Sequence, residues 1–213
     1  MVINLYRRLY RIYNNIMQLS GFNYQIKRFI YNNIKNKNVQ SILDAGCGTG
    51  ITGLSLLELY PNSNLLLTDI NRELLLKLQD KTSNKNNVLL GLSDISYPNK
   101  IKTLKGEELT ICDEEFDIIC AGANIGYSKN PEQTISTLYQ ILKPGGSIID
   151  LEMGRNFWGL TISKLYCYPV VSWGKIDNVV GRQGAIITIQ KISWFYFPLN
   201  LTRVYITITK PVN

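Results

Sequence analysis

The sequence contains no histidine in its 213 residues. This absence excludes serine or cysteine triads that use a histidine base, histidine-ligated metals and imidazole general acids. Any chemistry in this chain must therefore use carboxylates, tyrosines, amides or a bound cofactor.

Cysteine is scarce and poorly spaced for binding a metal. The four cysteines form no Cys-x-x-Cys pair, and without histidine a tetrahedral zinc site would need all of them. We therefore expect reduced thiols and no metal site. The cysteines are Cys47, Cys112, Cys120 and Cys167.

The sequence also lacks long apolar runs and a secretion signal. No run reaches about 20 apolar residues, the length of a membrane-spanning helix. The first residues lack the apolar block and small-residue cleavage site of a signal peptide. We expect a cytoplasmic protein.

Acidic residues are missing from residues 1–43, where seven basic residues lie. The whole chain has 23 basic and 16 acidic residues, so the net charge of +7 belongs to this segment and the remainder is neutral. A basic patch of this kind typically meets an anionic surface. We expect peripheral contact with an anionic membrane, and nucleic acid is a less favoured partner.

The N-terminal part predicts helices. Apolar residues spaced by three and four indicate amphipathic helices over residues 2–19 and 22–34, interrupted at Gly21. We interpret residues 1–38 as a helical cap on a main part formed by residues 39–213, the two making one structural domain.

The main part predicts an α/β sheet. Short apolar runs alternate with helix-length segments, which is typical of a parallel sheet covered on both faces. Two later runs alternate like an antiparallel pair. We therefore expect a mostly parallel, seven-stranded sheet with an antiparallel C-terminal strand pair. The expected strands are Ser41–Ala45, Leu65–Asp69, Val88–Leu92, Phe116–Ala121, Ser147–Leu151, Ala185–Ile192 and Arg203–Thr209, and helices are expected near 51–60, 71–80 and 131–142.

A glycine-rich segment stands where the first expected strand ends. From Asp44 to Gly50 the sequence reads DAGCGTG. Only glycine lets the backbone turn this tightly and approach a ligand this closely, and the free N–H groups of a helix start would face that ligand. This segment is therefore the strongest candidate for a binding loop.

Two kinds of ligand are compatible with this loop. Residues 48–53 also satisfy G-x-G-x-x-G, the dinucleotide-binding pattern, but a lone match is weak and leaves Asp44 without a task. In the other interpretation, Asp44 lies beside a cationic amino group of the ligand, where a charged hydrogen bond contributes roughly 1.5 to 3 kcal/mol. We favour the second interpretation.

The segment resembles the first motif of the class I S-adenosylmethionine-dependent methyltransferases, an acid followed by G-x-G-x-G. Residues 142–149, LKPGGSII, are similar to the family's turn into its fifth strand, and the resemblance covers about residues 40–153. It implies a Rossmann-like fold, S-adenosylmethionine as the cofactor and methyl transfer as the activity. In layout the chain is similar to the ubiquinone and menaquinone biosynthesis methyltransferases, although the match is loose outside the cofactor motifs.

The resemblance also implies a set of cofactor-binding residues. Asp69 ends the second expected strand, where a carboxylate can accept hydrogen bonds from ribose hydroxyls; alternatively, it is a helix N-terminal acid favoured by the helix dipole. Ile70 would lie against adenine and Asp94 near its amino group. Relative to the family, the chain has an insertion near residues 97–105. The expected residues are Asp44, Ala45, Gly46, Cys47, Gly48, Gly50, Asp69, Ile70, Asp94, Ala121 and Gly122.

The acceptor is less well defined. Because the methyl group is already activated on a sulfonium, the protein mainly positions the reactants, and we assign no catalytic residue. Tyr13, Asn124 and Tyr127 are the expected substrate-binding residues. Aromatic residues cluster before and after the sheet, which favours a quinone precursor or a lipid, although core packing explains them equally well. The alternatives are an RNA methyltransferase and a cofactor-binding scaffold subunit without catalysis.

Overall fold

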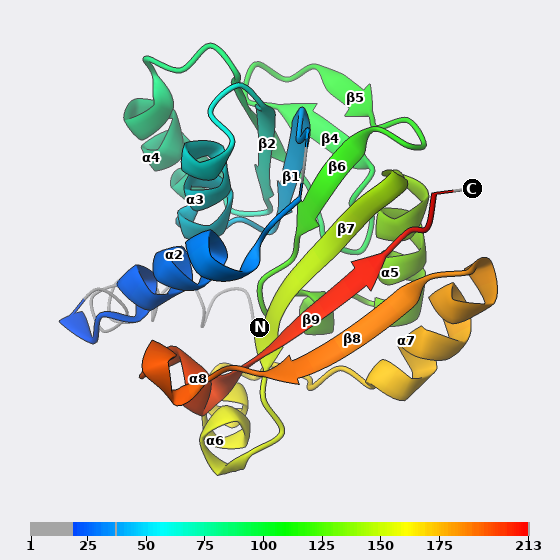
Figure 1. Cartoon of the computed structure of the whole chain (residues 1–213). Coiled ribbons are helices and arrows are strands. Elements are labelled where there is room, and N and C mark those ends of the chain that lie inside the picture. The colour runs from blue at the N-terminus through cyan, green and yellow to red at the C-terminus, as the bar shows by residue number, and fades with distance from the viewer. Residues whose placement is uncertain (1–18, 37, 213) are drawn as a thin grey trace.

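The computed structural model describes residues 19–36 and 38–212, and they form a single nine-stranded sheet (Figure 1). The strand order is β5-β4-β3-β2-β1-β6-β7-β9-β8. The five strands from β3 to β7 in this order are parallel, and the strands on either side of them pair antiparallel. The strands are β1 Ser41–Ala45, β2 Asn64–Asp69, β3 Val88–Leu92, β4 Lys100–Thr103, β5 Glu108–Thr110, β6 Phe116–Cys120, β7 Leu142–Met153, β8 Ile186–Lys191 and β9 Arg203–Thr209.

Helices cover both faces of the sheet. In Figure 1, α2, α3 and α4 lie on one side, and α5 and α7 lie on the other. The helices are α2 Phe22–Asn33, α3 Ile51–Leu59, α4 Arg72–Thr82, α5 Pro131–Gln140, α6 Phe157–Leu165, α7 Trp173–Val180 and α8 Leu199–Thr202, with short 3-10 helices η1 Ile125–Tyr127, η2 Gly181–Gln183 and η3 Trp194–Tyr196.

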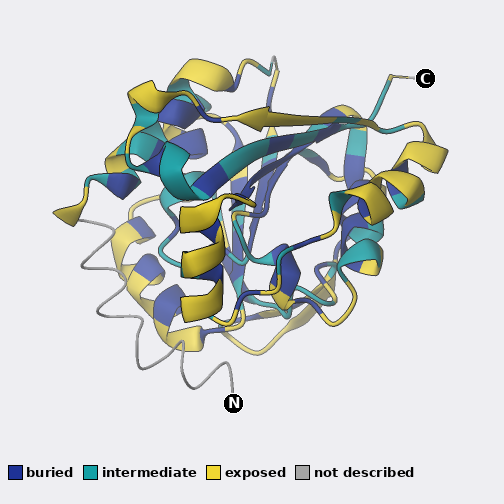
Figure 2. Cartoon of the chain, turned by 90° about the horizontal axis from the view of Figure 1, so that it is seen from below, coloured by how far each residue is buried: buried dark blue, intermediate teal, exposed yellow. Residues whose placement is uncertain are grey.

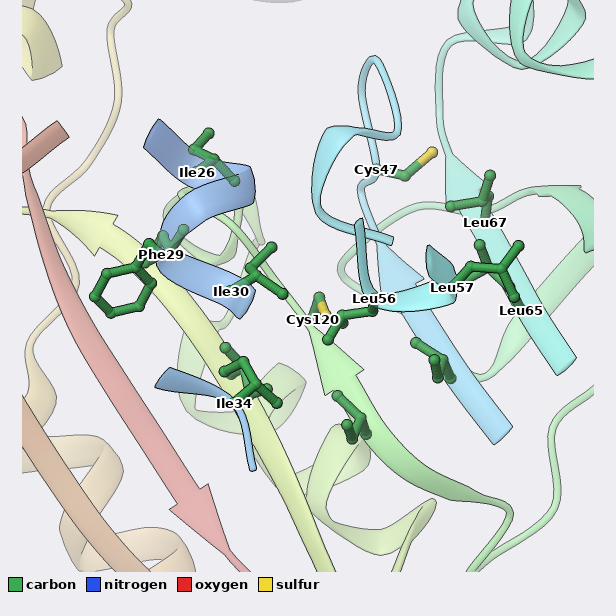
Figure 3. Packing of buried hydrophobic residues seen from close by; sticks show 14 of the residues in the cluster. Ile26, Phe29, Ile30, Ile34, Cys47, Leu56, Leu57, Leu65, Leu67 and Cys120 are labelled. Atoms are coloured by element: carbon green, nitrogen blue, oxygen red, sulfur yellow. The ribbon is translucent and has the colours of Figure 1, made fainter. Parts of the chain in front are cut away.

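The core consists of two apolar layers, one on each face of the sheet. Successive strand residues point to opposite faces, so Ile42 packs in the layer under α2, α3 and α4 while Leu43 packs in the layer under α5 and α7. Figure 3 shows Ile30 of α2 and Leu56 of α3 beside Cys120 of β6 in the first layer. Figure 2 shows the same arrangement as dark blue residues on the strands and on the inner sides of the helices.

Local sequence sets where several helices begin. The Asn71 side chain accepts a hydrogen bond from the Glu73 N–H at 3.0 Å and caps α4. The Asn130 side chain accepts one from Gln133 at 3.1 Å and caps α5, whose first residue is Pro131. Asparagine caps satisfy N–H groups that have no partner within the helix, and proline is favoured at the first helical position.

The predicted α/β class, the parallel sheet and the antiparallel C-terminal pair are confirmed. All seven expected strands are present, but the count of seven is too low, because β4 and β5 extend the sheet beyond β3. These two strands lie in and just after the expected insertion at 97–105. Both are short and largely polar, so they lack the apolar run that indicates a strand.

Other segments differ from the prediction more locally. The turn that the resemblance implies within residues 142–149 lies inside β7, as an irregularity between the pairs Phe116–Leu142 and Ile118–Ser147. Gly145 takes a left-handed φ of 78° there, which permits the extra residues. The helix expected over 2–19 lies outside the described residues except for Leu19.

No helix within residues 19–36 and 38–212 has the length and apolarity needed to cross a membrane. The four cysteines are free thiols, of which Cys47 and Cys120 are buried.

Candidate cofactor and acceptor site

The order of the strands reverses between β1 and β6. After β1, the chain continues to β2 and β3 on one side, and it later returns to place β6 on the other side of β1. The loops that follow β1 and β6 therefore diverge at the carboxyl edge of the sheet, where open α/β folds bind ligands. The predicted glycine loop and the predicted segment 121–127 both lie at this edge.

The glycine loop has the backbone conformation that the sequence predicted. Gly46, Gly48 and Gly50 have φ values of 69°, 54° and 76°, which disfavour residues with a side chain. The Cys47 N–H donates to the Thr68 carbonyl at 2.8 Å, so the loop is attached to the end of β2. A Cβ on Gly48 would meet no described atom within 4 Å, which leaves open space beside the loop.

Asp69 joins the two neighbouring strand ends. Its Oδ2 accepts a hydrogen bond from the Gly48 N–H at 2.8 Å, and its Oδ1 accepts one from the Asn71 N–H at 2.8 Å. Burial raises the pKa of this carboxyl, and the N–H donors of Asn71 and Gly48 counteract the rise. A carboxylate has about four acceptor positions, so Asp69 keeps capacity for ligand hydroxyls.

Asp44 is almost fully buried beneath the glycine loop. Its Oδ2 accepts a hydrogen bond from the Gly53 N–H at 2.8 Å, in the first turn of α3. Burial raises the pKa of Asp44 to about 7, the Gly53 hydrogen bond lowers it, and the nearby Asp69 charge raises it. Asp44 therefore connects β1 to α3 within the fold, and its predicted contact with a ligand amino group stays a prediction.

Asn124, expected at the acceptor, lies against the glycine loop. Its Nδ2 donates to the Ala45 carbonyl and, at 3.2 Å, to the Gly46 carbonyl. A Cβ on Gly46 would overlap the Asn124 side chain, so glycine is required there for steric as well as conformational reasons. The Asn124 Oδ1 is buried without a hydrogen-bond partner in the described chain, so it can accept from a ligand N–H group.

The remaining predicted cofactor residues follow neighbouring strands at the same edge. The Asp94 Oδ1 accepts from the Ser96 N–H at 2.8 Å, just after β3. Ala121 directly follows β6 and is fully buried, and its N–H donates to the Ile149 carbonyl of β7 at 3.0 Å. Gly122 is exposed, and a Cβ there would meet no described atom within 4 Å. Ile70, at 50% exposure, presents an apolar surface beside Asp69.

The structure describes only one of the two tyrosines that were predicted to bind the acceptor. The Tyr127 hydroxyl donates to the Tyr166 carbonyl at 3.0 Å, and its ring packs edge-on against Tyr168 with centroids 4.9 Å apart. Tyr127 thus lies in the loop after β6, as expected. Tyr13 lies outside the described residues.

The sequence analysis missed a buried polar cluster at the end of β7. Asp150 and Glu152 are 1% and 0% exposed, and Tyr168 and Arg203 lie close to them. The available signal was the segment Ile-Ile-Asp-Leu-Glu, in which two acids alternate with apolar residues in an expected buried strand. A buried charge is costly unless it is paired, so such acids in a buried strand indicate a function or a network.

The residues at this edge fit S-adenosylmethionine. Asp69 offers carboxylate oxygens for the ribose, Ile70 offers an exposed apolar face for adenine, and the Asn124 Oδ1 offers an unused acceptor. The positive φ values of the loop glycines let the backbone come close to such a ligand. Gly53, the last glycine of the G-x-G-x-x-G match, is explained by its contact with Asp44 and does not require a dinucleotide.

Comparisons with known proteins agree with this geometry. A family described as a methyltransferase domain matches residues 43–148. The chain is 30% identical over 121 residues to malonyl acyl-carrier-protein O-methyltransferase 2 of Ilyobacter polytropus, covering 57% of this chain and 42% of that protein. It is 30% identical over 130 residues to the mitochondrial ubiquinone biosynthesis O-methyltransferase of Dictyostelium discoideum, covering 55% of this chain and 36% of that protein.

The fold is also similar to that of a solved SAM-dependent methyltransferase from Aquifex aeolicus. The TM-score is 0.63 at 14% identity, and the likeness covers 92% of this chain and 96% of that chain. The chain spans less than half the length of the two relatives named above. The matched region contains the glycine loop, Asp69, Asp94 and the segment 121–127, all of which lie at the carboxyl edge of the sheet. The chain belongs to the class I S-adenosylmethionine-dependent methyltransferases.

Proposed function

We propose that this chain transfers the methyl group of S-adenosylmethionine to a small, apolar acceptor such as a quinone precursor or a lipid. The observation that carries the proposal is a group of exposed aromatic side chains beyond the same sheet edge as the glycine loop. The name of one relative, which refers to ubiquinone biosynthesis, supports an acceptor of this class.

The topology places the aromatic group beside the cofactor edge. The parallel strand β7 ends at Met153, opposite Arg203 of β9, and β8 ends at Lys191, opposite Val204. The segments that follow β7 and β8, namely α6 and η3, therefore lie beyond the carboxyl edge, and Figure 2 views the molecule from this side. Their exposed members are Phe157 at 73%, Trp158 at 53%, Trp194 at 71%, Phe195 at 59% and Phe197 at 62%.

The residues of the chain would act mainly by positioning. When bound, the cofactor supplies a methyl group that is already activated on a sulfonium. Asp69 and the glycine loop would hold its nucleoside part, and Asn124 would face its amino acid part. Holding donor and acceptor in line is the chief source of acceleration for such a displacement, so a strong base is not required.

We further propose that this aromatic face contacts an anionic membrane. The Arg28 guanidinium of α2 donates to the Phe195 carbonyl at 3.1 Å and lies 5.5 Å from the centre of the Tyr196 ring. A basic helix therefore lies directly against the exposed aromatic segment, and no acidic residue occurs before Asp44. Aromatic and basic side chains on one face favour binding to anionic lipid.

Product analysis tests the methyl-transfer proposal. The protein is incubated with methyl-labelled S-adenosylmethionine and a cell extract, which is then separated into lipid, RNA and small-molecule fractions. We expect label in the lipid or apolar small-molecule fraction, and less label with the Asp69→Ala variant when the labelled cofactor is limiting. Label in RNA would overturn the acceptor class, and label in no fraction would favour a scaffold without catalysis.

Vesicle sedimentation tests the membrane proposal. We expect binding to vesicles that contain phosphatidylglycerol but not to pure phosphatidylcholine, with loss of binding in high salt. The double variant Trp194→Ser and Phe195→Ser should bind less, whereas Leu109→Ser, an exposed apolar position on β5 at the far end of the sheet, should not change binding. Equal binding by all three proteins would refute the assignment of this face.

A further inference from the structure

Two acidic residues lie side by side in the interior at the end of β7. Asp150 and Glu152 are two positions apart on one strand, so they point to the same face of the sheet, the face covered by α5 and α7. They are 1% and 0% exposed. The mechanism described above uses neither of them.

The two carboxyls accept different numbers of hydrogen bonds from the groups around them. The Glu152 Oε2 accepts from the Tyr168 hydroxyl at 2.6 Å, and its Oε1 accepts from the Met153 N–H at 2.6 Å. The Asp150 Oδ1 accepts from the Ala123 N–H at 3.2 Å. The Asp150 Oδ2 is buried and has no partner among the described residues when the carboxyl is ionised.

Charge balance assigns the proton. Two adjacent buried carboxylates cannot both be ionised when only one cation acts on them, and among the described residues the cation whose charge acts on both is Arg203, which is 8% exposed. Glu152 receives two donors, so it is the ionised partner. A proton on the Asp150 Oδ2 gives that orphaned atom a partner, because it can then donate to Glu152.

This cluster holds the loop that follows β6. The Gly126 N–H donates to the Tyr168 hydroxyl at 3.0 Å, and the Ala123 N–H donates to Asp150, so the loop is fixed on both sides of Asn124. Ala123 has a φ of 49°, a conformation that is costly for alanine and persists only where neighbouring contacts enforce it. Asn124 in turn contacts Ala45 and Gly46 of the glycine loop.

We propose that Asp150 and Glu152 are positioning residues, a carboxyl pair sharing one proton that, with Tyr168, holds Asn124 against the glycine loop and so sets the affinity for the cofactor. The inference rests on cofactor binding at this site, but it adds residues that no cofactor motif contains. Neither carboxyl needs to touch the ligand for this role.

Asymmetric substitutions test the proposal. Asparagine at position 150 can donate to Glu152 as a protonated aspartic acid would, so Asp150→Asn should bind S-adenosylhomocysteine within about threefold of wild type. Glu152→Gln replaces the ionised acceptor of the Tyr168 hydroxyl with a neutral amide and should weaken binding by about tenfold or more. Isothermal titration calorimetry on the full chain measures both, and thermal melts establish that each variant is folded.

The pH dependence of S-adenosylhomocysteine affinity distinguishes this positioning role from a purely structural one. Burial, first, and the Glu152 charge raise the pKa of Asp150 far above its ordinary value, so wild-type affinity should fall in alkaline solution as the shared proton is lost. Asp150→Asn should remove that fall. The other titratable groups that interact electrostatically with the pair are Tyr168, Arg203 and Cys120, and all three are unchanged in this variant.

Each outcome is decisive. Equal effects of Asp150→Asn and Glu152→Gln, or an alkaline fall that persists in Asp150→Asn, would overturn the shared proton. If Glu152→Gln does not fold, Tyr168→Phe replaces it, because it removes one donor to Glu152 and the acceptor of the Gly126 N–H without changing charge, and it should weaken binding severalfold. If wild type binds no S-adenosylhomocysteine, the cofactor assignment fails too; if wild type binds and the variants match it, only this inference fails.

Discussion

Gly53 offers a stringent test of how the glycine loop is supported. A Cβ at this position of α3 would lie 2.7 Å from Leu67 Cδ2, 2.8 Å from Asp44 Oδ2 and 2.9 Å from Asp44 Cβ. All three distances are shorter than ordinary contacts, and Leu67 and Asp44 lie in adjacent central strands. Gly53→Ala must therefore displace one of these side chains.

The expected magnitude follows from two opposing effects. Overpacking a well-filled core costs about 1 to 3 kcal/mol, and a hydrogen bond to a charged carboxylate contributes roughly 1.5 to 3 kcal/mol if Asp44 is pushed away from the Gly53 N–H. Alanine gains up to about 1 kcal/mol over glycine in a helix interior. We expect a net destabilisation of about 2 kcal/mol.

Gly174 provides the matched control. It lies in α7, and a Cβ there would meet no described atom within 4 Å. Gly174→Ala should therefore be neutral or stabilising by up to about 1 kcal/mol. Urea denaturation followed by circular dichroism, on protein free of cofactor, measures both variants. A Gly53→Ala variant as stable as Gly174→Ala would refute the steric reasoning.

Two further predictions concern the acids at the strand ends. For Asp44, whose pKa is raised to about 7 in the fold, the native state binds the proton more tightly than the unfolded chain does. The contribution of this carboxyl to stability should therefore fall by on the order of 4 kcal/mol as pH rises from about 4 to 7. In denaturation measured across that range, wild type should lose more stability than Asp44→Asn does. Asp69→Ala should weaken S-adenosylhomocysteine binding by about 10- to 150-fold in calorimetry, as expected for lost hydrogen bonds to a charged group, whereas Glu73→Ala in the first turn of α4 should leave it unchanged. The same pH profile in wild type and Asp44→Asn, or the same affinity in Asp69→Ala and Glu73→Ala, would contradict these accounts.

The sequence predicted the central architecture well because its signals there are local. Each parallel strand is a short apolar run, and the segment from Asp44 to Gly50 needs positive φ values that glycine alone adopts readily. The helix expected near 131–142 likewise begins at Pro131, a residue type favoured in the first turn. These features depend on neighbours in the chain, so they can be read without the fold.

The features that the sequence did not predict depend on distant partners. β4 and β5 are polar and form by pairing with β3 and with each other. Asn124 was expected at the acceptor, but nothing in the sequence indicates that its amide reaches Ala45 and Gly46, 79 and 78 positions earlier. The cluster around Asp150 was missed because Tyr168 and Arg203 come from separate segments that the C-terminal strands bring together.

The position of β9 has a consequence for synthesis. β9 lies between β7 and β8 in the sheet, although it is the last strand in the sequence. A nascent chain that has not yet released residues 203–209 from the ribosome leaves one edge of β7 open and β8 without the strand it pairs with. Arg203 belongs to the same strand, so the buried acids at the end of β7 lack the effect of its charge until β9 is in place. The sheet therefore cannot be completed until β9 has left the ribosome, and chains stalled before that point should be aggregation-prone and sensitive to proteases.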